Sequence, residues 1–305
     1  MKKIFYILFF FLNITTLSAL ETRIIYVIEN EIITNIDIKS EYKYLLALNP
    51  SLKKLDKEKI LKISSNSIVK EKIKKIEVSK HFPSLDVNKQ YSDALLKNIY
   101  SGLNLKTIDE FNRYLKIYGL NVEDIRKKVA IEALWNELII EKYKSKIEID
   151  EKKLKNKIKI NTEVETIEYD LSEIVFEVKN KQDIAKRYEE IKKNIIEIGF
   201  ENAASIYSIS ETAKIGGNIG LITKRSLNTK IKNSISNLGL NEISKPIIIS
   251  NGILILKIKK INKIISKIDP DKELKRLINY ERNRMLNQYS KIYFNKVKKN
   301  ININE

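Results

Sequence analysis

Glycine is concentrated in one stretch of this chain. Residues 201–260 hold five of its eight glycines and one of its four prolines. A Gly-Gly-Asn-Ile-Gly turn at 216–220 stands directly before an apolar run, where a positive φ or a close backbone approach is needed. An Asn-Gly pair at 251–252 separates two β-branched runs, which is the strongest hairpin signal in the chain. This stretch therefore predicts a β-hairpin within a tightly turned segment around which the rest is arranged.

The region before this stretch has mainly helical periodicity. A short hairpin is expected at 23–33, and Thr34 with Asp37 then resembles a capping box that opens a helix. A weak interruption is expected at 64–67, where three of four residues are serine. Trp135 falls on the apolar stripe of a later helix, so we expect it in the core. Apolar residues at helical spacing predict helices at 34–48, 52–79, 88–100, 107–118 and 121–139.

The middle of the chain combines helices with strands. A charged helix at 151–160 is expected to act as a connector. A strand at 169–176 follows, with Ile174 and Phe176 on one face and Glu173 and Val175 on the other, because successive side chains alternate. Helical patterns are expected next at 183–198 and 200–204, and strands at 242–249 and 253–258.

The C-terminal segment carries a last predicted helix. Asp269-Pro270 marks its start, and the helical pattern runs to about residue 296. Its apolar positions are too many for a free tail, so we expect the helix to pack on another part of the protein. The predicted stripe consists of Leu274, Leu277, Met285, Tyr289 and Ile292.

The first residues have the features of a secretory signal peptide. Lys2 and Lys3 precede an apolar run at 4–12, and residues 15–19 supply the small side chains of a cleavage site near Ala19. An uncleaved membrane anchor is the alternative, although the apolar run is shorter than the roughly 20 residues needed to span a bilayer. The chain contains no cysteine. An exported chain without disulfides suits a bacterial periplasm.

The charge of the chain is strongly positive but widely spread. A formal net charge of +18 would ordinarily suggest nucleic acid or an anionic membrane as a partner. Lysine alternates with glutamate along the whole sequence, however, and few aromatic residues lie between the lysines to stack on bases. We therefore predict a solvated basic surface and no nucleic-acid partner, while contact with acidic partners stays open.

Several chemistries lack the residues they would need. No phosphate-binding Gly-Lys-Ser/Thr loop is present, so we expect no nucleotide and no cofactor. Metal catalysis and nucleophilic hydrolysis are poorly supported by a chain with no cysteine and one histidine. That histidine, His81, is expected to be an ordinary surface or helix-end residue.

Three spaced segments of the glycine-rich stretch resemble the parvulin, or PpiC-type, family of peptidyl-prolyl isomerases. They are the turn at 216–220, Leu-Asn-Glu-Ile-Ser-Lys-Pro at 240–246 and Ser-Asn-Gly-Ile-Leu-Ile at 250–255. The opening hairpin and capped helix resemble the start of SurA-type periplasmic chaperones, which implies an α+β fold. The implied division is a signal peptide at 1–19, a helical domain at 20–162, a parvulin-like domain at 163–265 with a four-stranded antiparallel sheet, and a C-terminal helix at 266–305 that packs on the helical domain.

The parvulin resemblance also implies a site. In that family two histidines flank a Cys or Asp, while Leu or Met and Phe grip the proline ring. Both histidine positions are changed here. A carboxylate at Glu173, if buried, must find a partner or take up a proton, and Ser210 is the candidate partner. The family positions fall on Glu173 and Leu254 for the histidines, Ser210 for the Cys or Asp, and Leu227 and Ile231 for the proline pocket.

These changes favour a chaperone over an enzyme. The first hypothesis is an ATP-independent periplasmic chaperone resembling SurA, which binds unfolded outer-membrane proteins or other exported polypeptides and has weak or no prolyl isomerase activity. No membrane span is expected after cleavage of the signal peptide. The alternative hypotheses are an active peptidyl-prolyl isomerase and a membrane-anchored foldase of the PpiD type with the leader retained.

Overall fold

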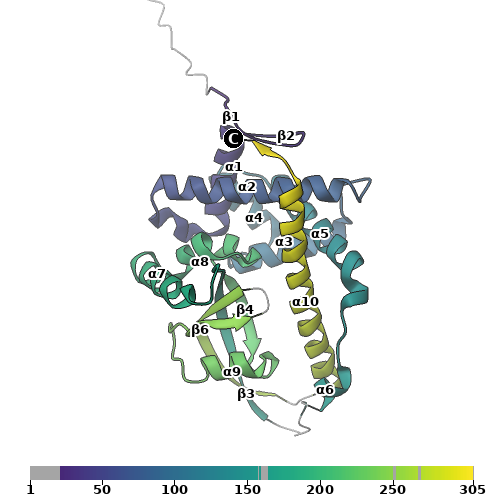
Figure 1. Cartoon of the computed structure of the whole chain (residues 1–305), viewed down its shortest axis with the longest axis vertical. Coiled ribbons are helices and arrows are strands. Elements are labelled where there is room, and N and C mark those ends of the chain that lie inside the picture. Colours follow the sequence, from purple (N-terminus) through teal and green to yellow (C-terminus); the bar gives the residue numbers. More distant parts are fainter. Residues whose placement is uncertain (1–20, 157, 159–163, 250–251, 267–268, 305) are drawn as a thin grey trace, which may run out of the picture.

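A computed structural model describes residues 21–156, 158, 164–249, 252–266 and 269–304 (Figure 1). The predicted signal peptide, the predicted domain boundary at 163 and the hairpin residues Ser250 and Asn251 lie outside the described residues. The chain forms a helical part and a part built on a sheet, with one long C-terminal helix beside both (Figure 1). The expected α+β fold is confirmed.

The helical part contains the predicted hairpin and five longer helices. The hairpin pairs Ile28 with Glu31, and the helices stack beneath it. The bounds are β1 (Ile24–Ile28), β2 (Glu31–Thr34), α1 (Asn35–Leu48), the 3-10 turn η1 (Pro50–Lys54), α2 (Lys57–Ser79), α3 (Lys89–Gly102), α4 (Ile108–Ile117), α5 (Val122–Tyr143), the 3-10 turn η2 (Lys144–Lys146) and α6 (Glu151–Lys155).

Side-chain caps fix where these helices begin. The Thr34 hydroxyl accepts a hydrogen bond from the Asp37 backbone N–H, and the Asp37 carboxylate accepts one from the Thr34 N–H, so the predicted capping box is present. At the starts of α4 and α5, the side chains of Thr107 and Asn121 accept a hydrogen bond from the N–H of Glu110 and Asp124, without the reciprocal bond of a capping box. Each cap satisfies N–H groups that the first helical turn leaves without partners.

Two predictions about the helical part were wrong. The serine-rich segment 64–67 does not interrupt α2, because the Ser64 hydroxyl donates to the Ile60 carbonyl and the Ser67 hydroxyl donates to Glu41. The serines thus satisfy their polar groups within the packed helices. The connector helix α6 ends at Lys155, which is shorter than the expected 151–160.

The sheet part follows α6. It contains the expected strand, the two helices after it and the hairpin, in which Ile249 pairs with Gly252. The bounds are β3 (Val164–Phe176), α7 (Asp183–Ile198), α8 (Phe200–Tyr207), the 3-10 turn η3 (Glu211–Ile215), β4 (Asn218–Thr223), the 3-10 turn η4 (Lys224–Ser226), α9 (Thr229–Ile235), β5 (Ile247–Ile249) and β6 (Gly252–Ser266).

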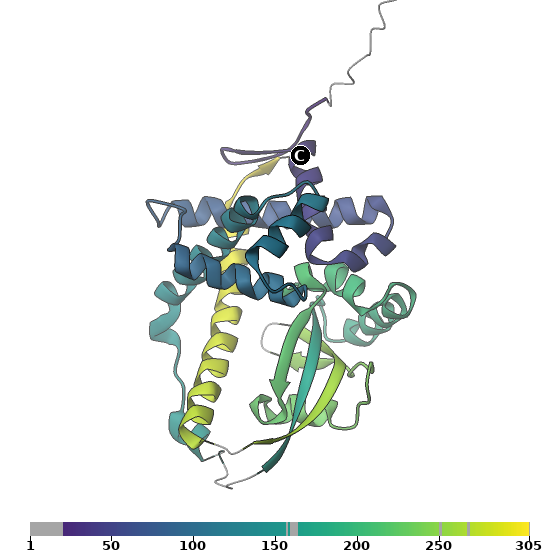
Figure 2. The same cartoon turned by 180° about the vertical axis from the view of Figure 1, so that it is seen from behind.

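The four strands form an antiparallel sheet in the order β4-β3-β6-β5. Long strands β3 and β6 run side by side through its centre (Figure 2). Ile174 and Phe176 pack with α7 and α8 on one face, whereas Val175 packs with residues of α9 on the other. The predicted alternation of β3 is therefore confirmed, and the two faces bury separate apolar clusters.

The C-terminal helix α10 (Pro270–Asn300) completes the core of the helical part, as the fold prediction required. Tyr293 and Val297 are buried with Trp135, and Trp135 itself is fully buried. The chain ends in β7 (Ile303–Asn304), which adds a third strand beside β1. The predicted stripe was wrong in detail, because Ile292 is 53% exposed and the buried face passes through Tyr293 and Val297 instead.

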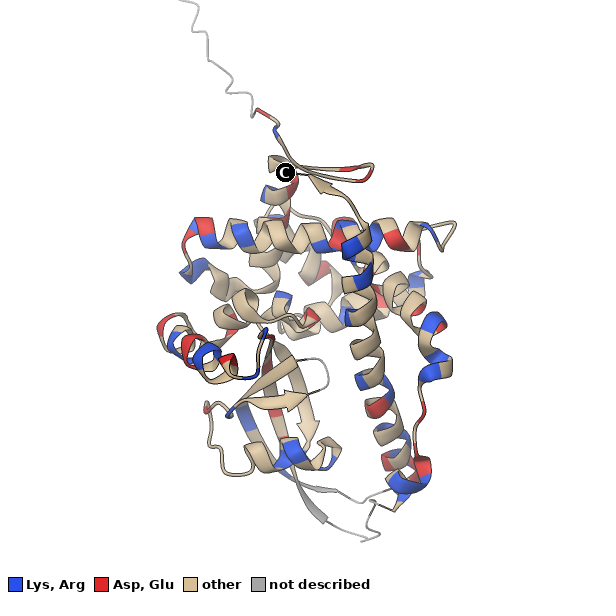
Figure 3. Ribbon diagram, in the orientation of Figure 1, with Lys and Arg blue, Asp and Glu red and all other residues tan. Residues whose placement is uncertain are grey.

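Charged residues are distributed over every part of the molecule (Figure 3). Lysine and arginine alternate with aspartate and glutamate along the helices. Within the described part of the chain, every helix is too short or too polar to cross a lipid bilayer.

Candidate functional site

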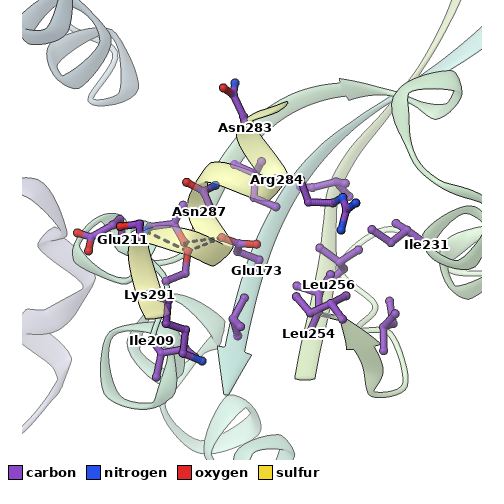
Figure 4. Close-up of a pocket in the computed structure, with 18 of the residues that line it drawn as sticks. Glu173, Ile209, Glu211, Ile231, Leu254, Leu256, Asn283, Arg284, Asn287 and Lys291 are labelled. Atoms are coloured by element: carbon purple, nitrogen blue, oxygen red, sulfur yellow. Dashed lines mark hydrogen bonds between the residues drawn. The ribbon is translucent and has the colours of Figure 1, made fainter. Parts of the chain in front are cut away.

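A cavity of about 750 Å³ lies between the sheet and the helical part. All four strands of the sheet, the segment after α8 and helix α9 supply the side of the cavity that belongs to the sheet part. Residues of α2 and α10 line it from the other side, and Figure 4 draws Asn283, Arg284 and Asn287 of α10 together with Glu173 of β3 around the cavity. The volume falls within the roughly 300–1,000 Å³ of ligand sites in proteins.

The five residues that the sequence singled out all line this cavity. Glu173 and Leu254 lie on the paired strands β3 and β6, where Glu173 is opposite Leu256 and Leu254 is opposite Val175. Ser210 precedes η3, and Leu227 and Ile231 come from the start of α9 and the residues before it. The structure thus brings these residues together, while their roles in binding or catalysis stay predictions.

The Glu173 carboxylate is held by two hydroxyl groups. The Ser210 hydroxyl donates to Glu173 Oε1 at 2.6 Å and the Thr212 hydroxyl donates to the same oxygen at 3.0 Å. The expected Ser210 partner is therefore present, and sequence reasoning missed Thr212. Together the two hydroxyl groups satisfy one oxygen of the Glu173 carboxylate at the wall of the cavity.

Gly217 fixes the backbone beside this carboxylate. The Glu173 N–H donates to the Gly217 carbonyl at 2.7 Å. A Cβ atom on Gly217 would lie 2.2 Å from the Glu173 carbonyl oxygen, and the φ of Gly217 is +78°. Only glycine permits this close approach in this conformation.

Aliphatic side chains make up the floor of the cavity. Leu227, Ile231 and Leu254 are buried in one cluster on this face of the sheet, together with Leu171, Val175 and Leu256. Ile248 also lines the cavity but is 52% exposed. An extended polypeptide could therefore bury an apolar side chain here without leaving its own polar groups far from water.

An ionic cluster joins the sheet part to the helical part at one end of the cavity. Lys74 of α2 contacts Glu211 at 2.9 Å and Glu132 at 2.6 Å, and Lys214 contacts Glu132 at 3.1 Å. Burial would raise the pKa of Glu211, but Lys214 and Lys74 hold it well below its ordinary value. Burial likewise opposes the charge on Lys214, and Glu132 and Glu211 outweigh this effect and raise its pKa. The four side chains form an alternating network across the boundary.

The cavity offers binding groups but no imidazole. Its described lining contains no histidine, and His81 lies at the end of α2 with Nε2 3.3 Å from Glu77 Oε1. Among the residues that the structure describes, no three His, Cys, Asp or Glu side chains are grouped to bind a metal ion. The site combines apolar walls, one hydroxyl-bound carboxylate and several cations.

Residues of α2 and α10 are the part of the site that sequence reasoning missed. Lys70 and Lys74 line the cavity although they precede the parvulin-like motifs by more than 100 residues. Arg284 and Asn287 also line it, and they follow the last of these motifs. Lysine is so common in this chain that no local signal distinguishes these positions.

Comparison with known proteins identifies the sheet part. A family model described as "Rotamase: PPIC-type PPIASE domain" matches residues 167–260. The chain is 27% identical over 169 residues to Chaperone SurA of Pseudomonas putida, a match that covers 52% of this chain and 39% of that protein. The chain thus matches about two fifths of the length of this curated relative. The predicted resemblance to a SurA-type chaperone with one PpiC-type domain is confirmed.

The comparison with solved structures matches an isolated domain and a longer protein. A PpiC-type peptidyl-prolyl cis-trans isomerase domain is 25% identical with a TM-score of 0.28, and the match covers 34% of this chain and 96% of that one. A SurA-like chaperone of Campylobacter jejuni is 19% identical with a TM-score of 0.33, and the match covers 92% and 98% of the two chains.

Proposed function

Taking residues 167–260 as a PPIC-type rotamase domain in a chain similar to SurA chaperones, we propose that this protein is an exported, ATP-independent chaperone. Its clients are unfolded outer-membrane proteins or other exported polypeptides in the periplasm. The observation that carries this proposal is the apolar cavity around which all five family positions gather. The cavity holds an extended client segment by its apolar side chains.

Capture of a client depends on exposed apolar surface at the rim of the cavity. Ile248 lines the cavity and is about half exposed, whereas Ile196 on α7 is 78% exposed and is not among the lining residues. The two isoleucines therefore offer a matched pair, since the change to serine removes the same side-chain atoms from two exposed positions. Only one of them contributes to the proposed site.

Aggregation of a denatured β-barrel protein tests the chaperone function. We expect the full chain to suppress light scattering at a near-stoichiometric ratio and the Ile248→Ser variant to need several-fold more protein, because burial of an isoleucine side chain is worth about 1.5–3 kcal/mol. The Ile196→Ser control should match the wild type. No suppression by the wild type would refute the proposed function.

We propose further that the prolyl isomerase activity of this domain is weak or absent. Rotation about an X-Pro bond faces a barrier of about 18–20 kcal/mol, and a catalyst must stabilise an amide that has lost its resonance. The family positions for histidine hold Glu173 and Leu254, and the aliphatic Leu254 has no group that donates or accepts a hydrogen bond. The imidazole network that the resemblance implies therefore cannot form.

A protease-coupled assay on a short proline peptide measures this activity. The wild type is expected to leave the isomerisation rate close to that of the peptide alone, and an acceleration proportional to protein concentration would contradict the proposal. The double variant Glu173→His/Leu254→His should raise the rate. No gain in a folded double variant would mean that the proline pocket itself is lost.

A further inference from the structure

The cavity carries more positive than negative side chains. Five cations line it against two carboxylates, Glu173 and Glu211. Those carboxylates already have donors, since Glu173 is bound by Ser210 and Thr212 and Glu211 contacts Lys74. The lining cations are Lys70, Lys74, Lys230, Arg284 and Lys291.

Four of these cations have partners within the protein. Lys74 contacts Glu132 and Glu211, and Arg284 Nε donates to Glu281 at 2.8 Å. Lys230 donates to the Ile248 carbonyl at 2.6 Å, and Lys291 contacts Glu177. Most of the positive charge around the cavity is therefore already paired.

Lys70 of α2 is different. It lines the cavity and is partly buried, yet it makes no hydrogen bond or ion pair with any residue that the structure describes. Burial lowers its pKa, Glu211 offsets part of this effect, and the charges of Lys214 and Lys74 lower the pKa further. A partly buried ammonium group without an ion-pair partner destabilises the folded protein, and an anion bound beside it would remove this cost.

We propose that Lys70 binds a carboxylate of the polypeptide held in the cavity, so that the site selects segments in which an acidic group stands beside apolar side chains. This inference rests on the proposed function and names the class of segment that the cavity prefers. The apolar floor of Leu227, Ile231 and Leu254 takes the hydrophobic side chain, and Lys70 pairs with the neighbouring carboxylate. Helix α2 of the helical part thereby completes a site that the sheet part alone does not contain.

A peptide rather than a nucleic acid fits these surroundings. The floor is aliphatic, and among the described lining residues the aromatic ones are Tyr280 and Phe294 of α10. Bases need aromatic platforms on which to stack, whereas aliphatic walls with one cation suit an apolar side chain beside an acid.

Fluorescence polarisation with short labelled peptides tests the inference on the full chain. The peptides share a Gly-Ser frame and carry Leu-Leu-Glu, Leu-Leu-Gln or Ser-Ser-Glu at the centre. We expect the Glu peptide to bind about tenfold more tightly than the Gln peptide, the equivalent of one charge-assisted hydrogen bond. The preference should fall as salt is added, and Ser-Ser-Glu should bind weakly because it lacks apolar side chains.

Two substitutions on the same helix isolate the role of Lys70. Lys70→Met removes the charge and keeps the length of the side chain, so it should abolish the preference for Glu over Gln. Lys62→Met makes the same change at an exposed position of α2 and should leave the preference intact. A preference that survives in a folded Lys70→Met protein would overturn the inference.

The source of the carboxylate is resolved by peptides that end in Leu-Leu with a free or an amidated C-terminus. Tighter binding of the free acid identifies a terminal carboxylate, and tighter binding of the internal Glu peptide identifies a side chain. Equal binding of charged and neutral peptides to the wild type would refute the inference while leaving the proposed function in place. Failure of every apolar peptide to bind would instead count against the proposed function.

Discussion

Gly217 lies against the backbone of Glu173, and the contact leaves no space for a side chain. The same segment supplies Ser210 and Thr212, whose hydroxyls hold the Glu173 carboxylate. The position of the carboxylate therefore depends on a turn in which Gly216, Gly217 and Gly220 all have positive φ. Glycine is needed here for the geometry of the site as well as for the turn.

Alanine at two glycines separates backbone strain from steric overlap. Gly220 has a φ of +84° and open space where a Cβ would lie, so Gly220→Ala should cost about 1–3 kcal/mol from strain alone. Gly217→Ala should cost clearly more, because its Cβ would also meet the Glu173 carbonyl oxygen at 2.2 Å. Urea denaturation measures the free energy of unfolding of both variants. Equal losses would contradict this expectation and would mean that the backbone of β3 at Glu173 moves to make room for the added Cβ atom.

Lys70 gives a prediction about stability that needs no ligand. The folded-state pKa of Lys70 lies below the ordinary value of 10.5, so the folded protein binds this proton less tightly than the unfolded chain does. The protonated Lys70 therefore lowers the free energy of unfolding. Lys70→Met should therefore melt at a higher temperature than the wild type at pH 7. The advantage should shrink as pH rises towards 10.5, and Lys62→Met should show neither effect.

These residues were predictable to different degrees. Glu173, Ser210 and Leu254 were found because the parvulin-like motifs place them in order along one domain. Thr212 was missed because a threonine in a polar turn carries no distinctive pattern. Lys70 was missed because its place in the site depends on how α2 packs against the sheet part, which local sequence does not encode.

At the scale of elements, α10 contributes to two different surroundings. Its C-terminal half packs against α5 through Tyr293, whose ring lies tilted against Trp135 with ring centroids 5.6 Å apart. Ser290 accepts a hydrogen bond from the Trp135 indole at 2.8 Å. The preceding residues Tyr280, Asn283 and Arg284 line the cavity, and the lining continues along α10 to Phe294. One helix therefore anchors the core and forms a wall of the site.

Adjacent residues of α10 test which face is buried. Tyr293→Ala should lower the free energy of unfolding by about 3 kcal/mol or more, since it removes a buried aromatic side chain. Ile292→Ala should change it by less than about 0.5 kcal/mol, because this side chain is more than half exposed. Chemical denaturation of both variants makes the comparison, and equal losses would place the helix in another rotation.

Element boundaries followed the sequence where a cap defined them. Thr34, Thr107, Asn121 and Asp269 were each identified as helix starts, and each accepts a hydrogen bond from the first turn of its helix. The buried face of α10 was predicted wrongly, because the apolar residues of this 31-residue helix fit more than one helical stripe. A long helix with two kinds of neighbour has no single buried face for periodicity to reveal.

At the scale of the whole molecule, the sheet part is attached to the helical part by polar contacts. Asn49 donates to Ser205 at 3.1 Å, and Lys74 and Lys214 connect Glu211 with Glu132. Apolar contacts also cross this boundary, because Ile198 and Ile206 pack against the core of the helical part. The relative positions of the two parts therefore depend on this charge network together with those apolar contacts.

Glu211 makes this dependence measurable. Its pKa lies well below the ordinary value of 4.5, so its contribution to stability is fully present above pH 4.5 and is lost as the pH falls further. Glu211→Gln should lower the urea midpoint at pH 7, and the difference from the wild type should decline towards about pH 3. Glu189→Gln removes a carboxylate whose ion pair with Lys192 lies within α7, and it should leave the midpoint unchanged at both pH values. A constant difference for Glu211→Gln would contradict this account.

The long pairing of β3 with β6 has a consequence for how such proteins diversify. Val164, near the point where the chain enters the sheet part, lies opposite Ser266, near the point where it departs. The two ends of the sheet part are therefore adjacent, as they are in a domain inserted into a loop. We expect that such an inserted domain can be removed, duplicated or replaced by joining the two adjacent chain ends, while the helices of the helical part keep their positions.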